Sequence, residues 1–292
     1  MDLEILDDTR CHLGEGPVWD VEQQALYWVD SLGPAIFSHD WAARTTRRWD
    51  LTGESIGSLA VRKSGGLILA MDTGFHSFDP LTGNTELIAD PLAGTTDTRF
   101  NDGKVDRAGR FVAGGVNGVA GSGLEPQPVC GMFRLNHDLS VSQVLDGFAC
   151  FNGPCFSPDG KTLYVTGRGN MQHIEAFTYD PVTGTVGTGK VLIDGIDPDG
   201  ATIDSEGFIW SAQWGGGCVL RISPEGDVDR RIDLPDHVVS SVMFGGPELD
   251  TLFITTLGKP HWGTTPNAPD AGAVFIIQDI GFQGLPERRF EG

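Results

Sequence analysis

The sequence predicts an all-β protein built as a six-bladed β-propeller, with residues 1–292 forming one domain. Three observations lead to this fold class. A unit made of a turn and a short β-rich run recurs along the chain, no segment shows sustained helical periodicity, and Gly and Pro are abundant, at 41 and 17 of 292 residues. Because 292 residues are long for one compact core, a repeating architecture accounts for the length.

The repeats follow one another at nearly equal intervals. Their turns open at Asp20, Lys63, Asp106, Ser157, Asp204 and Gly246, which lie 43, 43, 51, 47 and 42 residues apart. The β-rich runs that follow these turns are residues 25–29, 67–71, 111–113, 163–166, 208–212 and 252–256. A period of roughly 40 to 50 residues is typical of propeller blades.

A second β-rich run extends several of the repeats. Residues 75–78, 175–179 and 218–222 each end at a turn that contains Pro, and such runs are typical of strands. A long β-sandwich is the alternative fold with the same strand content. The near-equal periods favour radial repetition over the sandwich.

The charge balance limits the partners that the protein can have. The 20 basic and 40 acidic residues give a net charge of -20, which repels nucleic acid and anionic lipid, so we expect neither as a partner. The first residues are acidic where a secretory signal would be basic, and no apolar run reaches membrane-spanning length. We therefore expect a cytoplasmic protein.

The cysteines indicate neither a disulfide framework nor a thiolate zinc site. There are five, an odd number, and no two form a Cys-x-x-Cys pair: Cys11, Cys130, Cys150, Cys155 and Cys218. We expect reduced core residues, Cys155 in particular, because the strand that contains it should be buried.

Polar side chains recur at one phase of the repeat, upstream of the turns. Five residues before the turn-opening residue stand Glu15, Ser58, Asn101, Asn152 and Asp199, and Ser240 and Ser241 lie near the same phase in the sixth repeat. The strand that contains this position is the innermost strand of a propeller blade and lines the central channel. These side chains should therefore converge on the axis.

Carboxylate and carboxamide oxygens at one point predict a site for a hard divalent cation. Two carboxylates offset the charge of the cation, amides add neutral oxygens, and an open position allows Lewis-acid catalysis. The alternative is that Asn-Gly and Asp-Gly pairs are simple turns. Four polar residues in the same phase, each upstream of a separate turn, favour the metal site.

Four motifs carry a resemblance to a known family. They are Gly14-Glu15-Gly16-Pro17-Val18-Trp19, Arg99-Phe100-Asn101-Asp102-Gly103-Lys104-Val105-Asp106, Asn152-Gly153-Pro154-Cys155-Phe156-Ser157-Pro158-Asp159-Gly160 and Pro198-Asp199-Gly200. Together they resemble the SMP-30/gluconolactonase/regucalcin-like family of sugar lactonases over nearly the full chain. The resemblance implies a six-bladed propeller with one divalent metal held by Glu15, Asn152 and Asp199. It also implies that Arg99 and Asn101 contact substrate, with Asp102 beside them.

The resemblance further implies the hydrolysis of an aldonolactone, a pentono- or hexonolactone, to its sugar acid. The metal polarises the lactone carbonyl, and Asp199 acts as general base toward water. Oxygen ligands allow Ca²⁺, Mg²⁺ and Mn²⁺, and family members also use Zn²⁺ or Fe²⁺. The expected partner is a small sugar lactone, in which Arg99 and Asn101 bind hydroxyl or ring oxygens. For Arg99 the alternative is a solvated surface charge.

Departures from the family pattern lie near the expected mouth of the channel. Gly167-Arg168 and Gly115-Val116 replace the Asp-Ser or Asp-Thr and the Thr-Met pairs of many relatives, so substrate preference is expected to differ. Two Gly/Pro-rich loops, 117–129 and 259–270, are candidates for deciding specificity. Three side chains, Trp214, His261 and Trp262, stand where a sugar ring can stack, with simple packing as the alternative.

Two other functions remain open at this point. One is a non-catalytic propeller, either an interaction scaffold or a calcium-binding regulator that uses the same site without turnover. The other is a lactonase or esterase of apolar lactones. Polar residues on the axis favour the sugar lactonase, whereas the sugar, the metal and the oligomeric state are left open by the sequence.

Overall fold

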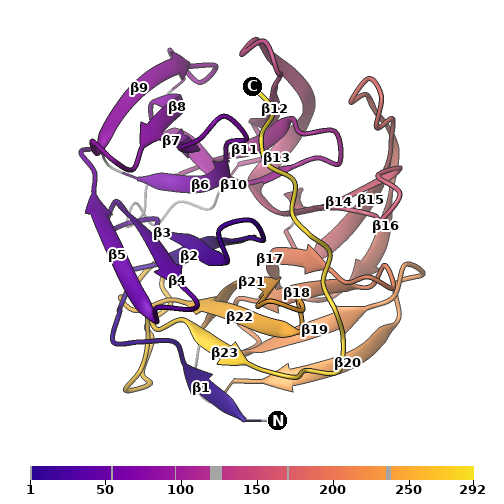
Figure 1. The fold of residues 1–292 in the computed structure, drawn as a ribbon. Helices are drawn as coiled ribbons and strands as arrows, with labels where there is room; N and C mark the ends of the chain where they lie inside the picture. The colour runs from indigo at the N-terminus through magenta and orange to yellow at the C-terminus, as the bar shows by residue number, and fades with distance from the viewer. Residues whose placement is uncertain (1, 54, 96, 119–126, 170, 235–237) are drawn as a thin grey trace.

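The predicted repeats fold into antiparallel meanders that lie around a common centre in a β-propeller-like arrangement (Figure 1). The computed structural model describes residues 2–53, 55–95, 97–118, 127–169, 171–234 and 238–292. Within these ranges the regular structure is all strand, and no helix occurs that could cross a membrane. The β-rich runs expected from the sequence overlap β3, β7, β11, β14, β18 and β22.

The first two sheets are four-stranded meanders in chain order. One contains β2 (Gly14–Asp20), β3 (Ala25–Asp30), β4 (Ala35–Asp40) and β5 (Thr45–Asp50). The next contains β6 (Ile56–Val61), β7 (Leu67–Met71), β8 (Gly74–Asp79) and β9 (Asn84–Ala89). In both, the first three strands are largely buried and the fourth is largely exposed, which places the fourth strand at the outside.

The third sheet has seven strands because one long strand belongs to two meanders. Its members are β10 (Thr98–Val105), β11 (Phe111–Asn117), β12 (Cys130–Leu135), β13 (Val141–Phe156), β14 (Thr162–Arg168), β15 (His173–Tyr179) and β16 (Val186–Asp194). Residues 141–148 of β13 pair with β12, and residues 148–156 pair with β14. The strand is thus outermost in one meander and innermost in the next.

In the last two sheets, one follows chain order and the other takes its edge strand from the N-terminal segment. One contains β17 (Pro198–Ile203), β18 (Ile209–Gln213), β19 (Cys218–Ile222) and β20 (Val228–Asp233). The other joins β21 (Val239–Gly245), β22 (Thr251–Thr256) and β23 (Phe275–Ile277) to the N-terminal β1 (Leu3–Ile5). Because β1 pairs antiparallel with β23, residues from both ends of the chain complete one sheet, which protects an edge.

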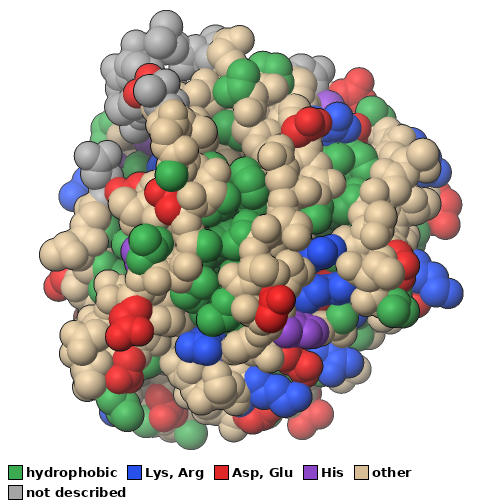
Figure 2. Space-filling view, turned by 90° about the horizontal axis from the view of Figure 1, so that it is seen from above, with side chains coloured by type: hydrophobic (Ala, Val, Ile, Leu, Met, Phe, Trp, Pro, Cys, Tyr) green, Lys and Arg blue, Asp and Glu red, His purple; other side chains and the backbone are tan. Residues whose placement is uncertain are grey.

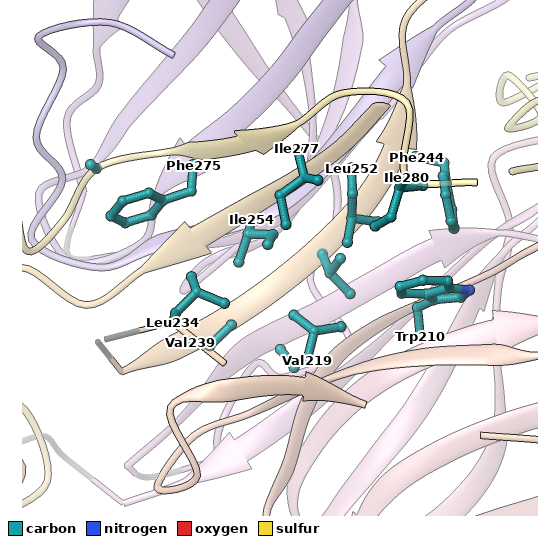
Figure 3. Packing of buried hydrophobic residues seen from close by; sticks show 13 residues of the cluster. Trp210, Val219, Leu234, Val239, Phe244, Leu252, Ile254, Phe275, Ile277 and Ile280 are labelled. Carbon is teal, nitrogen blue, oxygen red and sulfur yellow. The ribbon is translucent and has the colours of Figure 1, made fainter. Parts of the chain in front are cut away.

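Hydrophobic clusters between neighbouring sheets hold the arrangement together. In the cluster of Figure 3, Trp210 and Val219 from β18 and β19 face Phe244, Leu252 and Ile254 from β21 and β22. All five side chains are fully buried. Burying such a side chain contributes roughly 1.5–3 kcal/mol, so sheet-on-sheet packing is the main source of stability.

The innermost strands form a closed ring. Each contacts the next in the order β2, β6, β10, β13, β17 and β21, and β21 contacts β2 again. Two of these strands, β6 and β10, approach each other so closely that only glycine fits between them. A Cβ at Gly57 in β6 would collide with the carbonyl oxygen of Asn101 in β10, so Gly lets these two strands approach.

The C-terminal segment crosses one face of the ring (Figure 1, yellow). Arg289 forms an ion pair with Asp20 at 2.7 Å, and the Phe290 backbone N–H donates to the Val61 carbonyl at 2.8 Å. Glu287 lies 3.9 Å from the buried amine of Lys104. These contacts tie the segment to three different sheets.

The surface carries charges of both signs around apolar furrows. In the face shown in Figure 2, hydrophobic side chains fill the spaces between backbone ridges, and acidic and basic side chains are scattered around them. Scattered apolar surface of this kind is normal for a folded protein.

Candidate active site

The register of every innermost strand shifts at the position that the sequence analysis singled out. The shifts lie between Glu15 and Val18 in β2, Ile56 and Ser58 in β6, Phe100 and Gly103 in β10, Asn152 and Cys155 in β13, Pro198 and Ala201 in β17, and Val239 and Ser241 in β21. A bulge re-aims the side chain that it carries. The residues after Glu15 and Asn152 are glycines with φ of 51° and 56°, a conformation that favours Gly.

The bulges bring five of the predicted residues to one pocket. Glu15, Arg99, Asn101, Asn152 and Asp199 all line it, and it encloses about 600 Å³ of empty space including its open mouth. The other described lining residues are Leu13, Cys150, Gly167, Met171, Asp197, Pro198, Trp214, His261 and Trp262.

Hydrogen bonds orient the polar side chains of the pocket. Arg99 Nη1 donates to Asn101 Oδ1 at 3.1 Å and to the Phe100 carbonyl at 2.9 Å. Asn101 Nδ2 donates in turn to Asn152 Oδ1 at 2.7 Å and to the Phe151 carbonyl at 2.9 Å. The arginine is therefore a pocket residue, and the chain of bonds fixes both amides before any ligand arrives.

Three buried acids cluster at and behind the pocket, and each is poorly stabilised in its ionised form. Burial raises the pKa of Glu15 to about 8, and the nearby Asp102 adds to the shift. The pKa of Asp199 is raised well above its usual range by burial and by the charges of Glu15 and Asp102. Burial also raises the pKa of Asp102. Without a further cation, the ionised forms of these acids are unstable.

The poorly stabilised carboxylates and the donor set fit a divalent cation. Glu15 and Asp199 offer carboxylate oxygens and Asn152 offers an amide oxygen, which are the donors that hard cations prefer. In the described ranges no group of three or more His, Cys, Asp or Glu side chains could hold a metal ion. The candidate ligands at the pocket fall outside such groups because only two of them, Glu15 and Asp199, are carboxylates and the third, Asn152, is an amide.

Asp102 lies behind the pocket. The family resemblance grouped it with the substrate-contacting residues, but it is not among the lining residues of the pocket. Its Oδ1 accepts the Gly103 backbone N–H at 2.7 Å, and its Oδ2 accepts the Gly153 N–H at 2.9 Å. Because Gly153 follows Asn152 directly, the carboxylate braces the backbone that presents this amide.

We expect Asp102→Ala to weaken metal binding by about 10- to 100-fold, as loss of an outer-shell partner typically does. Isothermal titration of the chelator-treated protein with Ca²⁺ and Mn²⁺ measures the change. The control is Asp138→Asn, which removes an exposed carboxylate. Wild-type affinity in Asp102→Ala would show that the brace is unnecessary.

Cys150 is a pocket residue that the sequence analysis assigned to the core. Its Sγ lies 3.5 Å from Nδ2 of both Asn101 and Asn152, and burial raises the pKa of the thiol. All five cysteines are buried and free, as predicted, and Cys155 lies in a hydrophobic cluster. The spacing in the sequence could have placed Cys150 in the pocket. It stands two residues before Asn152, and residues two apart in an extended strand share one face.

The 117–129 and 259–270 loops were predicted as candidates for deciding specificity, and the structure describes only part of the first. Residues 119–126 of the 117–129 loop lie outside the described ranges. From the 259–270 loop, His261 and Trp262 line the pocket beside Trp214.

Comparison with known proteins identifies the family. A family model described as the SMP-30/Gluconolactonase/LRE-like region matches residues 13–258. The chain belongs to this family. Relatives similar over nearly their whole length support the assignment. The pentonolactonase XacC of Haloferax volcanii is 33% identical over 97% of this chain and 96% of its own. The 6-deoxy-6-sulfogluconolactonase of Pseudomonas putida is 35% identical over 96% and 95%.

A solved structure of similar sequence has the same fold. It is a calcium-binding protein, regucalcin, from Agrobacterium tumefaciens, with a TM-score of 0.85 and 25% identity over 98% of this chain and 96% of its own. The agreement extends over the whole ring of sheets.

Gly167 of this SMP-30/gluconolactonase chain stands where the backbone has no room for a side chain. Gly167 has a φ of 95°, and a Cβ there would collide with the Cys150 carbonyl oxygen across β13 and β14. A residue with a side chain therefore does not fit this backbone. Glycine at this position lets the two strands approach at the pocket wall.

We expect Gly167→Ala to lower the free energy of unfolding by about 2 kcal/mol or more, through strain and collision. Urea unfolding measures it. Gly169→Ala is the matched control, because Gly169 has a φ of 59° but open space around its Cβ position. Equal losses in both variants would rule out the collision as the cause.

Proposed function

We propose that this chain is a six-bladed β-propeller and a metal-dependent sugar lactonase that hydrolyses an aldonolactone to its sugar acid. One observation carries the proposal. Glu15, Asn152 and Asp199 come from three different innermost strands and line a single pocket together with Arg99 and Asn101. The names of the two lactonase relatives support the same reaction class.

The ring of innermost strands supports the blade count. Six strands take part in it, and the seven-stranded sheet counts as two blades because β13 serves both. The pairing of β1 with β23 supplies the outermost strand of the last blade.

Glu15, Asn152 and Asp199 would hold one divalent cation, Ca²⁺, Mg²⁺, Mn²⁺, Zn²⁺ or Fe²⁺. A bound cation supplies Lewis acidity toward the lactone carbonyl and offsets the charge of the two buried carboxylates. The raised pKa values of both acids are the feature of this chain that calls for such a counter-charge.

The side chains of the pocket then divide the work of hydrolysis. The Asp199 carboxylate accepts a proton from the water whose oxygen bonds to the lactone carbonyl carbon. The bond between that carbon and the ring oxygen breaks, and the proton passes to the ring oxygen, which leaves as a hydroxyl group. Arg99 and Asn101, already oriented by their mutual hydrogen bond, hold sugar oxygens during the reaction.

The test is proton release from a panel of pentono- and hexonolactones by chelator-treated protein, with each divalent metal added back separately. We expect turnover that disappears with chelation and returns with at least one metal. An apolar lactone, such as a long-chain γ-lactone, completes the panel. Turnover of the apolar lactone alone would overturn the sugar assignment.

A calcium-binding protein without turnover is the second candidate. The likeness to a structure described as a calcium-binding regucalcin favours it. Tight Ca²⁺ binding in calorimetry, together with hydrolysis no faster than the spontaneous rate for every lactone, would select this function.

A further inference from the structure

An aromatic corner forms the outer wall of the pocket. His261 stacks on Trp262, with ring centroids 4.9 Å apart and planes 18° apart, and meets Trp214 edge-on at 6.2 Å. All three side chains line the pocket. A flat apolar surface of this kind suits the C–H face of a sugar ring.

Hydrogen bonds hold the aromatic corner in place. His261 and Thr264 exchange two backbone hydrogen bonds of 2.9 Å, and the indole N–H of Trp214 donates to the Thr264 hydroxyl at 3.3 Å. Trp262 has a φ of 43°, which is rare for a bulky residue. Strained backbone that the surroundings enforce is typical of ligand sites.

The aromatic corner carries no positive charge at neutral pH. His261 is 6% exposed, and burial, followed by the charge of Arg99, lowers its pKa to about 4. Among the described lining residues the one arginine or lysine is Arg99, whose Nη1 is engaged by Phe100 and Asn101. The residues outside the described ranges contain no Lys or Arg in the sequence.

A carboxylate stands beside this wall instead. Asp197 is exposed, lines the pocket, and its Oδ2 accepts the Gly215 N–H at 2.6 Å. Its carbonyl accepts the Trp214 backbone N–H at 2.9 Å, so the acid is fixed beside the backbone of Trp214 and Gly215. The outer pocket therefore presents negative charge and aromatic surface to the far end of a ligand.

We propose that this outer pocket selects uncharged aldonolactones and rejects lactones with an anionic group at the end remote from the carbonyl, such as a phosphate or a sulfonate. The inference rests on the proposed function and names the substrate class of the same site. An anion placed there faces Asp197 without a cationic partner, and it loses water against the aromatic wall. An uncharged hydroxymethyl group meets neither cost.

The experiment compares glucono-1,5-lactone with its 6-phosphate, which differ only at that remote end. With saturating metal and correction for spontaneous hydrolysis, we expect kcat/KM to favour the uncharged lactone by about 100-fold or more, because like charges at close range are strongly disfavoured. Asp197→Asn keeps an acceptor for the Gly215 N–H and should reduce this preference by roughly 10-fold.

Two further variants separate charge from packing. Asp194→Asn is the matched control for Asp197→Asn, because Asp194 is exposed, also accepts a backbone N–H, at 2.8 Å from Gly195, and does not line the pocket. It should leave the preference unchanged. Trp262→Ala should raise KM for the uncharged lactone by about 10-fold, with a smaller change in kcat, because it removes stacking rather than chemistry.

The outcomes distinguish this inference from the proposed function. Equal or faster hydrolysis of the phosphorylated lactone, or an Asp197→Asn preference like that of the wild type, overturns the inference while the lactonase assignment stands. Should no lactone be hydrolysed, the proposed function fails, and calorimetry with gluconate and 6-phosphogluconate decides the inference instead. Tighter binding of gluconate supports it; equal binding, tighter binding of the phosphate or no binding of either overturns it.

Discussion

Asp199→Asn is expected to lower kcat by about 10³-fold even at saturating metal, because the variant loses the carboxylate that accepts the proton of water. Glu15→Gln should behave differently. It removes a carboxylate from the same buried cluster, so its metal affinity should fall at least about 10-fold, but it keeps the base. At saturating metal the Glu15→Gln enzyme should therefore recover most of its kcat. Steady-state kinetics over a range of metal concentrations measures both effects.

The two variants are matched because each replaces a buried acid by its neutral isostere. Asp199 is 5% exposed and Glu15 is 8% exposed, and the pKa of each is raised by burial. Thermal unfolding of both metal-free proteins checks that the fold survives. If excess metal restores Asp199→Asn as fully as Glu15→Gln, Asp199 is a ligand only and another group is the base.

The position of the pocket residues within each repeat was predictable because polar residues followed by small ones recur there. In β2, β13 and β17 the pocket residue is followed by Gly, and each strand shifts register there, so the same sequence feature both marks and causes the inward turn of the side chain. The repeat pattern alone was therefore enough to single out Glu15, Asn101, Asn152 and Asp199, whereas the choice of three of them as metal ligands rested on the family resemblance.

The direction of Asp102 was harder to predict because a bulge interrupts strand alternation. Arg99 and Asn101 share one side of β10, and both line the pocket. Asp102 is the next residue, at the register shift, and points to the backbone of β13. Its partner Gly153 lies 51 residues away, a pairing that a single sequence does not contain.

Two other features depend on contacts between distant segments. The sheet that joins β1 to β23 pairs Leu3 with Ile277, and the aromatic corner joins Trp214 to Thr264 across 50 residues. The sequence indicates that Trp214 and His261 are near the mouth, but only packing decides that they share one wall. Long-range contacts of this kind leave no local periodicity to detect.

Chelator-treated protein is expected to lose stability as the pH rises from about 5 to 8.5, and metal should reverse this trend. Glu15 has an ordinary pKa of 4.5 in the unfolded chain and about 8 in the folded one. The folded protein therefore binds more protons than the unfolded chain across this interval. The stabilising contribution of the protonated Glu15 carboxyl is complete below pH 4.5 and is lost as the pH passes 8. Raising a pKa by one pH unit on folding corresponds to about 1.4 kcal/mol, so the loss amounts to several kcal/mol.

Metal acts in the opposite direction because it binds the ionised carboxylates and displaces their protons. At about 100 times its dissociation constant, a bound ion stabilises the folded protein by about 2.7 kcal/mol, and the affinity itself rises with pH. The difference in Tm between metal-loaded and chelator-treated protein should therefore widen from pH 5 to pH 8.5.

The net charge of -20 also destabilises the protein as pH rises, so the comparison needs Glu15→Gln, which keeps the other charges. A shallower decline in metal-free Glu15→Gln than in wild type assigns the slope to Glu15, whereas identical slopes would mean that general charge repulsion causes it.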